Sequence, residues 1–201
     1  MAERTFSPRV LQRFAQTLSA EIGEEALAAV LEKSGLPQEW SRPQFFAAFD
    51  ATRAARAYAQ LQAALRTYYG RGARGTLLRI GSKLWQRLLD DAALGVKAQA
   101  LAIRSLPKTM RAKPALDLLA RMLSASSGSV NAYVQDLDLL LVDKVSASAL
   151  DQTSDAPICF VTLGLARECL FWADGQEHDI EERACRALGA AQCEFKINIG
   201  G

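Results

Sequence analysis

Apolar residues in the first half of the chain recur at intervals of three and four, which is the spacing of amphipathic helices. Ser7 followed by Pro8 indicates a helix start, because the serine can cap the first turn and proline suits the first helical position. The helices predicted from this pattern lie at 7–22, 27–35, 43–69, 77–88 and 114–124. The glycine-rich stretch 70–75 separates the third from the fourth.

The period changes after Gly128. Residues 130–134 alternate and residues 139–142 form a short apolar run, so both are predicted strands. A packed helix is expected at 157–172, followed by a hairpin at 180–199 that turns at 188–191. The expected fold class is therefore α+β, with N-terminal helices followed by a small antiparallel sheet that carries one helix across it.

Composition is that of an ordinary soluble globular protein, with 50% hydrophobic and 23% charged residues among 201. This length fits one domain, 43–201, with a helical extension at 1–42. No apolar run is long enough to cross a bilayer, and the first residues lack the apolar centre of a signal peptide. A cytoplasmic location without a membrane span is therefore expected.

Charge is distributed unevenly although the net charge is only +2. Residues 1–115 hold 18 Lys and Arg against 9 Asp and Glu, whereas residues 116–201 hold 6 against 13. The small net charge argues against a nucleic-acid partner. The basic half is either a face for an anionic ligand or partner, or a set of solvated helix surfaces.

Four cysteines lie in the C-terminal third, and two of them, Cys185 and Cys193, flank the turn of the predicted hairpin. Glu182 stands three residues before Cys185, and Cys159 precedes the packed helix. Three thiolates and one carboxylate can close a tetrahedral structural metal site, which leaves no open position for catalysis. The alternative is that these cysteines are small buried hydrophobes, as is expected for Cys169.

The segment from Cys159 to Ile197 resembles the C-terminal signature of the 4-vinyl reductase domain family, over about the last 45 residues. The matching features are Cys159, Gly164, Glu182-x2-Cys185, Gly189 and Cys193 followed by alternating strand residues. The resemblance implies a fold similar to subunits of a vesicle-tethering complex. It also implies a structural zinc ion held by Cys159, Glu182, Cys185 and Cys193.

Residues Gly70, Gly72 and Gly75 match the spacing of a dinucleotide-binding fingerprint. That motif must follow a buried strand, and here it follows a helical pattern, so a nicotinamide site is rejected. The loop is instead expected to lead into a helix N-terminus, where backbone amides and arginines can meet a carboxylate or phosphate. The alternative is a solvated basic turn.

Six residues around this loop are candidate ligand-binding residues. The arginines would meet an anionic group, and the aromatic side chains would stack on a flat ring or form part of the core. They are Arg71, Arg74, Arg79, Tyr68, Tyr69 and Trp85. The segment 68–81 also resembles one that stand-alone members of the family carry between their helices.

His178 is the sole histidine and lies in a polar stretch, so a surface position is expected. No Walker motif, HExxH motif or other catalytic signature is present, and no catalytic residue is assigned. Enzymatic activity is left open on this basis.

The family resemblance implies a protein that binds a hydrophobic small molecule. Its stand-alone members point to a magnesium-porphyrin or chlorophyllide intermediate of bacteriochlorophyll biosynthesis, which the protein would carry to a pathway enzyme. Two alternatives are an 8-vinyl reductase, for which the chain offers no cofactor motif, and a sensing domain for an aromatic or lipid effector. The resemblance also implies a homodimer.

Overall fold

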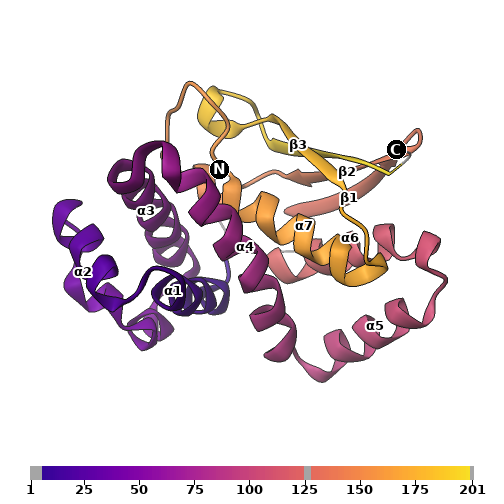
Figure 1. The fold of residues 1–201 in the computed structure, drawn as a ribbon, viewed down its shortest axis with the longest axis horizontal. Helices are drawn as coiled ribbons and strands as arrows, with labels where there is room; N and C mark the ends of the chain where they lie inside the picture. The colour runs from indigo at the N-terminus through magenta and orange to yellow at the C-terminus, as the bar shows by residue number, and fades with distance from the viewer. Residues whose placement is uncertain (1–5, 125–127, 200–201) are drawn as a thin grey trace.

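The computed structural model describes residues 6–124 and 128–199, which form a helical half and a half built on a four-stranded sheet (Figure 1). The helices are α1 (Pro8–Ile22), α2 (Glu24–Lys33), α3 (Ala51–Tyr69), α4 (Ala73–Asp90), α5 (Leu94–Ser105), α6 (Ala112–Leu123) and α7 (Phe160–Asp174). The strands are β1 (Val130–Gln135), β2 (Asp138–Asp143), β3 (Asp179–Ala184) and β4 (Cys193–Asn198). The predicted α+β class is confirmed.

The structure differs from the predicted helices in two places. The helix expected from Pro43 begins only at Ala51, because Asp50 caps that helix by accepting a hydrogen bond from the Arg53 amide at 2.8 Å. Residues Pro43–Ala48 form a separate 3-10 turn instead. Helix α5 was not predicted, because it buries only Ala100 and Ile103 and so lacks a wide apolar stripe.

The sheet is antiparallel and has the strand order β1-β2-β4-β3. Its two hairpins, β1–β2 and β3–β4, are joined side by side through the β2–β4 pair. Alternation places Phe195 and Ile197 of β4 on the buried face, and Lys196 between them on the other face. Figure 1 shows α6 and α7 lying along one side of this sheet. The predicted strands and the C-terminal hairpin are therefore confirmed.

Helices α4 and α7 cross at two glycines, Gly81 and Gly164. A Cβ atom added at Gly81 would lie 2.3 Å from the Val161 carbonyl oxygen, and one at Gly164 would lie 2.2 Å from the Leu78 carbonyl oxygen. Only glycine lets the two backbones approach this closely. The crossing joins the helical half to α7, which begins next to Cys159 and carries Trp172 in its last turn.

Helix α1 packs on α3 and α4, so the N-terminal residues share a core with the rest of the chain. The predicted boundary between 1–42 and 43–201 stays a prediction. Within the described residues, no helix combines the length and the apolarity needed to cross a membrane.

Candidate thiolate cluster and ligand groove

Four predicted ligand residues meet where α7 begins beside the β3–β4 hairpin. Cys159 caps α7, Glu182 lies on β3, and Cys185 and Cys193 stand on either side of the hairpin turn. One ligand atom from each lies within 4.8 Å of the others, and all four residues are buried. The Cys159 sulfur is 3.5 Å from that of Cys193 and 4.0 Å from that of Cys185.

The carboxyl group of Glu182 is only partly satisfied in this cluster. Its Oε2 accepts a hydrogen bond from the Cys159 amide at 3.0 Å, whereas its Oε1 is buried and has no hydrogen-bond partner in the part of the chain that the structure describes. Burial raises the pKa of Glu182 to about 8. An unpaired buried carboxyl oxygen beside three sulfur atoms is a favourable environment for a cation that prefers thiolate ligands.

The thiols themselves influence one another's ionisation. Hydrogen bonds from Cys159 and then Cys193 lower the pKa of Cys185, because they stabilise its thiolate. Cys169 lies outside the cluster and donates to the Ala115 carbonyl oxygen at 3.2 Å. The structure thus brings the four predicted residues together and leaves Cys169 apart; their role as metal ligands stays a prediction.

The glycine-rich loop forms a short 3-10 turn, Gly70–Gly72, at the corner between α3 and α4. Arg71 and Arg74 are exposed, and the Arg74 guanidinium lies 5.9 Å from the Phe160 ring centre. Tyr68 and Tyr69 are half-buried, with ring centres 5.0 Å apart in an edge-to-face arrangement. The ligand-binding role of these four side chains stays a prediction.

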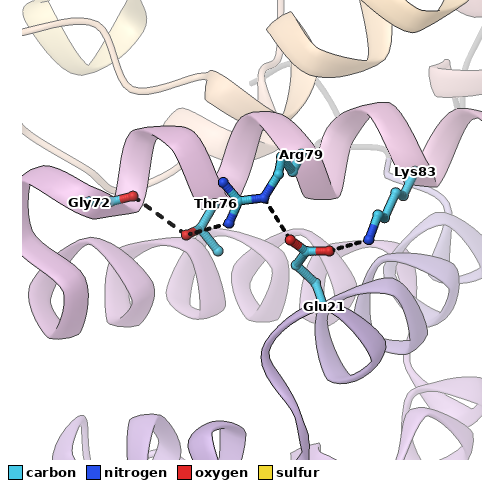
Figure 2. Close-up of polar contacts among 5 residues, drawn as sticks. All are labelled: Glu21, Gly72, Thr76, Arg79 and Lys83. Carbon is cyan, nitrogen blue, oxygen red and sulfur yellow. Dashed lines mark hydrogen bonds and ion pairs between the residues drawn. The ribbon is translucent and has the colours of Figure 1, made fainter.

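Arg79 is held in a charge cluster between α1 and α4. Figure 2 shows the Glu21 carboxylate between Arg79 and Lys83, with the Arg79 Nε donating to Glu21 at 2.7 Å. Arg79 also reaches the Thr76 hydroxyl at 3.5 Å, and that hydroxyl donates to the Gly72 carbonyl oxygen. Its guanidinium therefore joins two helices, and its contact with a ligand stays a prediction.

Replacing Glu21 with glutamine is expected to lower the free energy of unfolding at pH 7 by about 0.5–1 kcal/mol. Hydrogen bonds from Arg79 and then Lys83 hold the pKa of Glu21 below its usual value of 4.5. The stabilisation is therefore present above pH 4.5 and is lost as the pH falls through the lower folded-state pKa. Urea unfolding of both proteins from pH 7 to pH 3 measures it. A difference that stays constant over this range would show that the charge contributes nothing.

Trp85, a predicted ligand residue, is fully buried in α4. Its ring packs edge-to-face on Trp172 of α7, with ring centres 5.5 Å apart. Trp172 in turn lines an open groove of about 450 Å³ between α4, α5 and α7. Apolar side chains form most of its walls, with charged side chains among them. The lining residues are Leu89, Asp90, Lys97, Ala100, Leu101, Arg104 and Trp172. Trp85 thus lies directly behind the groove wall.

Helix α5 forms one wall of this groove and is weakly anchored. Leu94 and Leu101 are 87% and 71% exposed, although leucines of this kind usually belong to a core. Arg104 of α5 donates to the Trp172 carbonyl oxygen, and Arg111, which precedes α6, donates to the Ala173 carbonyl oxygen at 3.0 Å. The first bond ties α5 to the end of α7, and neither bond covers the apolar face of α5. The groove was not predictable from the sequence, because one of its walls is α5 and the sequence does not predict that helix.

The prediction that His178 is a surface residue is wrong. Its side chain is only 7% exposed, because it folds back on α7 and its Nε2 lies 2.8 Å from Asp174 Oδ2. It borders a second cleft, of about 420 Å³, whose lining is largely polar and charged. The lining residues are Ser82, Arg167, Glu168, Phe171, Glu177, His178 and Asp179.

Comparison with known proteins shows the fold but no family. No family model matches the chain, and no curated protein matches it. An H-NOX protein from S. oneidensis in the Fe(II)NO state is 14% identical and has a TM-score of 0.58, covering 96% of this chain and 98% of its own. A second H-NOX structure, from work on haem distortion in that family, is 14% identical with a TM-score of 0.54, over 96% and 94%. The phenol-responsive sensory domain of the transcription activator PoxR, with phenol, is 15% identical with a TM-score of 0.50, over 71% and 73%.

These findings overturn the 4-vinyl reductase assignment. It rested on a short C-terminal pattern, whereas the match to H-NOX structures extends over almost the whole chain. The role in bacteriochlorophyll biosynthesis depended on that family and is withdrawn with it. The expectation of a structural zinc ion is also wrong. The similar H-NOX structures are described with Fe(II) and with haem, so the metal associated with them is iron.

The residues of this chain do not fit a haem. A haem needs an axial ligand, commonly histidine, beside an apolar slot for the macrocycle. His178 is the sole histidine; its Nε2 is paired with Asp174, and it borders the largely charged cleft described above. Cys169 is fully buried and bonded to Ala115, and the other three cysteines face one another. The shared fold therefore does not extend to the haem-binding chemistry.

Proposed function

We propose that this chain is a small-molecule-binding domain of the sensory type, and that its ligand is an organic molecule other than haem. The observation that carries the proposal is the groove between α4, α5 and α7, whose volume of about 450 Å³ lies within the range of ligand sites. The fold supports it, since the similar structures include the sensory domain of PoxR, which responds to phenol.

The walls of the groove suit an apolar ligand. Trp172 offers an aromatic surface, and Leu89 of α4 and Ala100 of α5 add apolar side chains to the groove lining. Leu101 leaves 71% of its surface exposed. Covering such side chains stabilises a complex by about 25 cal/mol for each Å² of apolar surface removed from water. A ligand seated here would also contact both α5 and α7 and so tie the weakly anchored helix to the core.

The neutral fluorescent probe N-phenyl-1-naphthylamine is expected to bind the protein saturably, at one molecule per chain. Replacing Leu101 with aspartate should weaken binding by about tenfold or more, because it places a charge in the apolar wall. Leu94 provides a matched control, since it is an exposed leucine of the same helix outside the groove lining. Fluorescence titration of the three proteins measures these affinities. Unsaturable binding, or equal losses in L94D and L101D, would refute the assignment of the site.

We also propose that Cys159, Glu182, Cys185 and Cys193 act together as ligands of one cation that prefers thiolates. The unpartnered Glu182 Oε1 among three buried sulfur atoms supports this role. Such a closed site would fasten the β3–β4 hairpin to the start of α7 and so hold the far end of the helix that carries Trp172. A second copy of the chain as a partner stays a prediction.

A further inference from the structure

The groove between α4, α5 and α7 contains a positive charge that no described residue pairs with. Lys97 lines the groove and forms no ion pair with any residue that the structure describes. The other two charged groups of the lining are each held by a hydrogen bond with a neutral group, and both keep their charge. Asp90 accepts a hydrogen bond from the Gln86 side-chain amide at 2.9 Å, and Arg104 donates to the Trp172 carbonyl oxygen.

The position of Lys97 along α5 separates this charge from the aromatic part of the groove. Lys97, Leu101 and Arg104 lie at successive turns on one side of the helix, which places Lys97 about 10 Å along the axis from Arg104. Trp172 lies at the end of the groove formed by Arg104, whose guanidinium donates a hydrogen bond to the Trp172 carbonyl oxygen. The groove therefore presents an uncommitted cation, then an apolar stretch, then an indole ring.

Two buried polar atoms in and behind the walls also lack partners. The Trp85 Nε1 and the Gln99 Oε1 are buried and form no hydrogen bond with any residue in 6–124 or 128–199. Trp85 packs against Trp172, and Gln99 precedes the lining residue Ala100 on α5. Unsatisfied buried groups cost stability and are rare in packed interiors. Trp85 belongs to α4 and Gln99 to α5, the two helices that form the groove together with α7, although neither residue lines it.

We propose that the groove binds an amphipathic monocarboxylate, with its apolar part along Leu101 and Trp172 and its carboxylate on Lys97. This inference rests on the proposed function and names the ligand class of the same site. An apolar ligand without an anionic group would leave the Lys97 ammonium beside a covered apolar surface. A carboxylate of matching length would gain a charge-assisted hydrogen bond there.

Displacement of N-phenyl-1-naphthylamine by decanoate and by decan-1-ol at low ionic strength tests the inference. The two molecules share a ten-carbon chain and differ in the charge of the head group. Decanoate is expected to displace the probe at about tenfold lower concentration than decan-1-ol. In K97Q this preference should disappear, whereas in K108Q it should remain, because Lys108 is an exposed lysine outside the groove lining.

The outcomes separate this inference from the function on which it rests. Equal displacement by the acid and the alcohol in the unmodified protein would overturn the carboxylate assignment and leave the groove as a site for neutral ligands. A preference for decanoate that survives in K97Q would place the anion elsewhere and also overturn it. Failure of the probe itself to bind would remove the proposed function, and the inference with it.

Discussion

Replacing Gly164 with alanine is expected to lower the free energy of unfolding by about 3 kcal/mol. The added Cβ would stand 2.2 Å from the Leu78 carbonyl oxygen and 3.1 Å from the Gly81 Cα, and both of these are backbone atoms of α4. Neither can move aside as a flexible side chain would, so α4 and α7 must separate along their contact. Urea unfolding followed by circular dichroism measures the loss.

Gly95 provides the matched control for this substitution. It lies in α5 with an ordinary helical φ, and a Cβ added there would meet no atom within 4 Å. Gly95→Ala should therefore leave stability unchanged or raise it by about 0.5–1 kcal/mol, because alanine favours the helix. If Gly164→Ala unfolds at the same urea concentration as Gly95→Ala, the close crossing of α4 and α7 is not a feature of the folded protein.

Replacing Cys193 with serine is expected to abolish stoichiometric binding of Co²⁺, chosen as a probe because its bonds to thiolates produce a charge-transfer absorption band. Removal of one of three clustered sulfur atoms leaves too few soft ligands to close the site. The unmodified protein, freed of metal with a chelator, should regain the band at one Co²⁺ per chain. Elemental analysis of the protein as purified tests whether the four residues hold an ion in the cell.

Cys169→Ser separates loss of a ligand from general damage. Cys169 is as fully buried as Cys193, but its sulfur bonds to the Ala115 carbonyl oxygen, a contact that a serine hydroxyl can also make. This variant should keep the Co²⁺ band and its stoichiometry. If it loses the band equally, or if C193S keeps the band, the four residues are not a ligand set.

Much of the backbone was predictable from sequence because strong local signals coincide with real boundaries. Ser7 and Pro8 open α1 at the expected position, although the Ser7 side chain makes no capping hydrogen bond in the described chain. The alternation in β4 matches its buried and partly exposed faces. The thiolate cluster was also predictable as a juxtaposition, since a hairpin returns Cys193 to the neighbourhood of Cys185. The family resemblance built on the same residues was wrong, because few positions in a short segment carried it.

The groove could not have been predicted in the same way. Helix α5 keeps Leu101 exposed and buries Ala100, so its apolar residues do not mark the face that packs on the protein. The aromatic ring of Trp85 predicts a contact with a flat ligand, yet Trp85 lies behind the wall, and Trp172 forms the surface instead. The surface position predicted for His178 is wrong, because its pairing with Asp174 depends on how the chain turns after α7, which a polar sequence does not specify.

Fluorine NMR of protein labelled with 5-fluorotryptophan shows most directly whether the groove holds the ligand. The three tryptophans each give a resonance: Trp172 lines the groove, Trp85 packs behind it, and Trp40 lies apart among Phe46 and Phe49. Titration with N-phenyl-1-naphthylamine should shift the Trp172 and Trp85 resonances together and leave that of Trp40 in place. A saturated complex in which Trp172 does not shift, or in which Trp40 alone shifts, would place the ligand outside the groove.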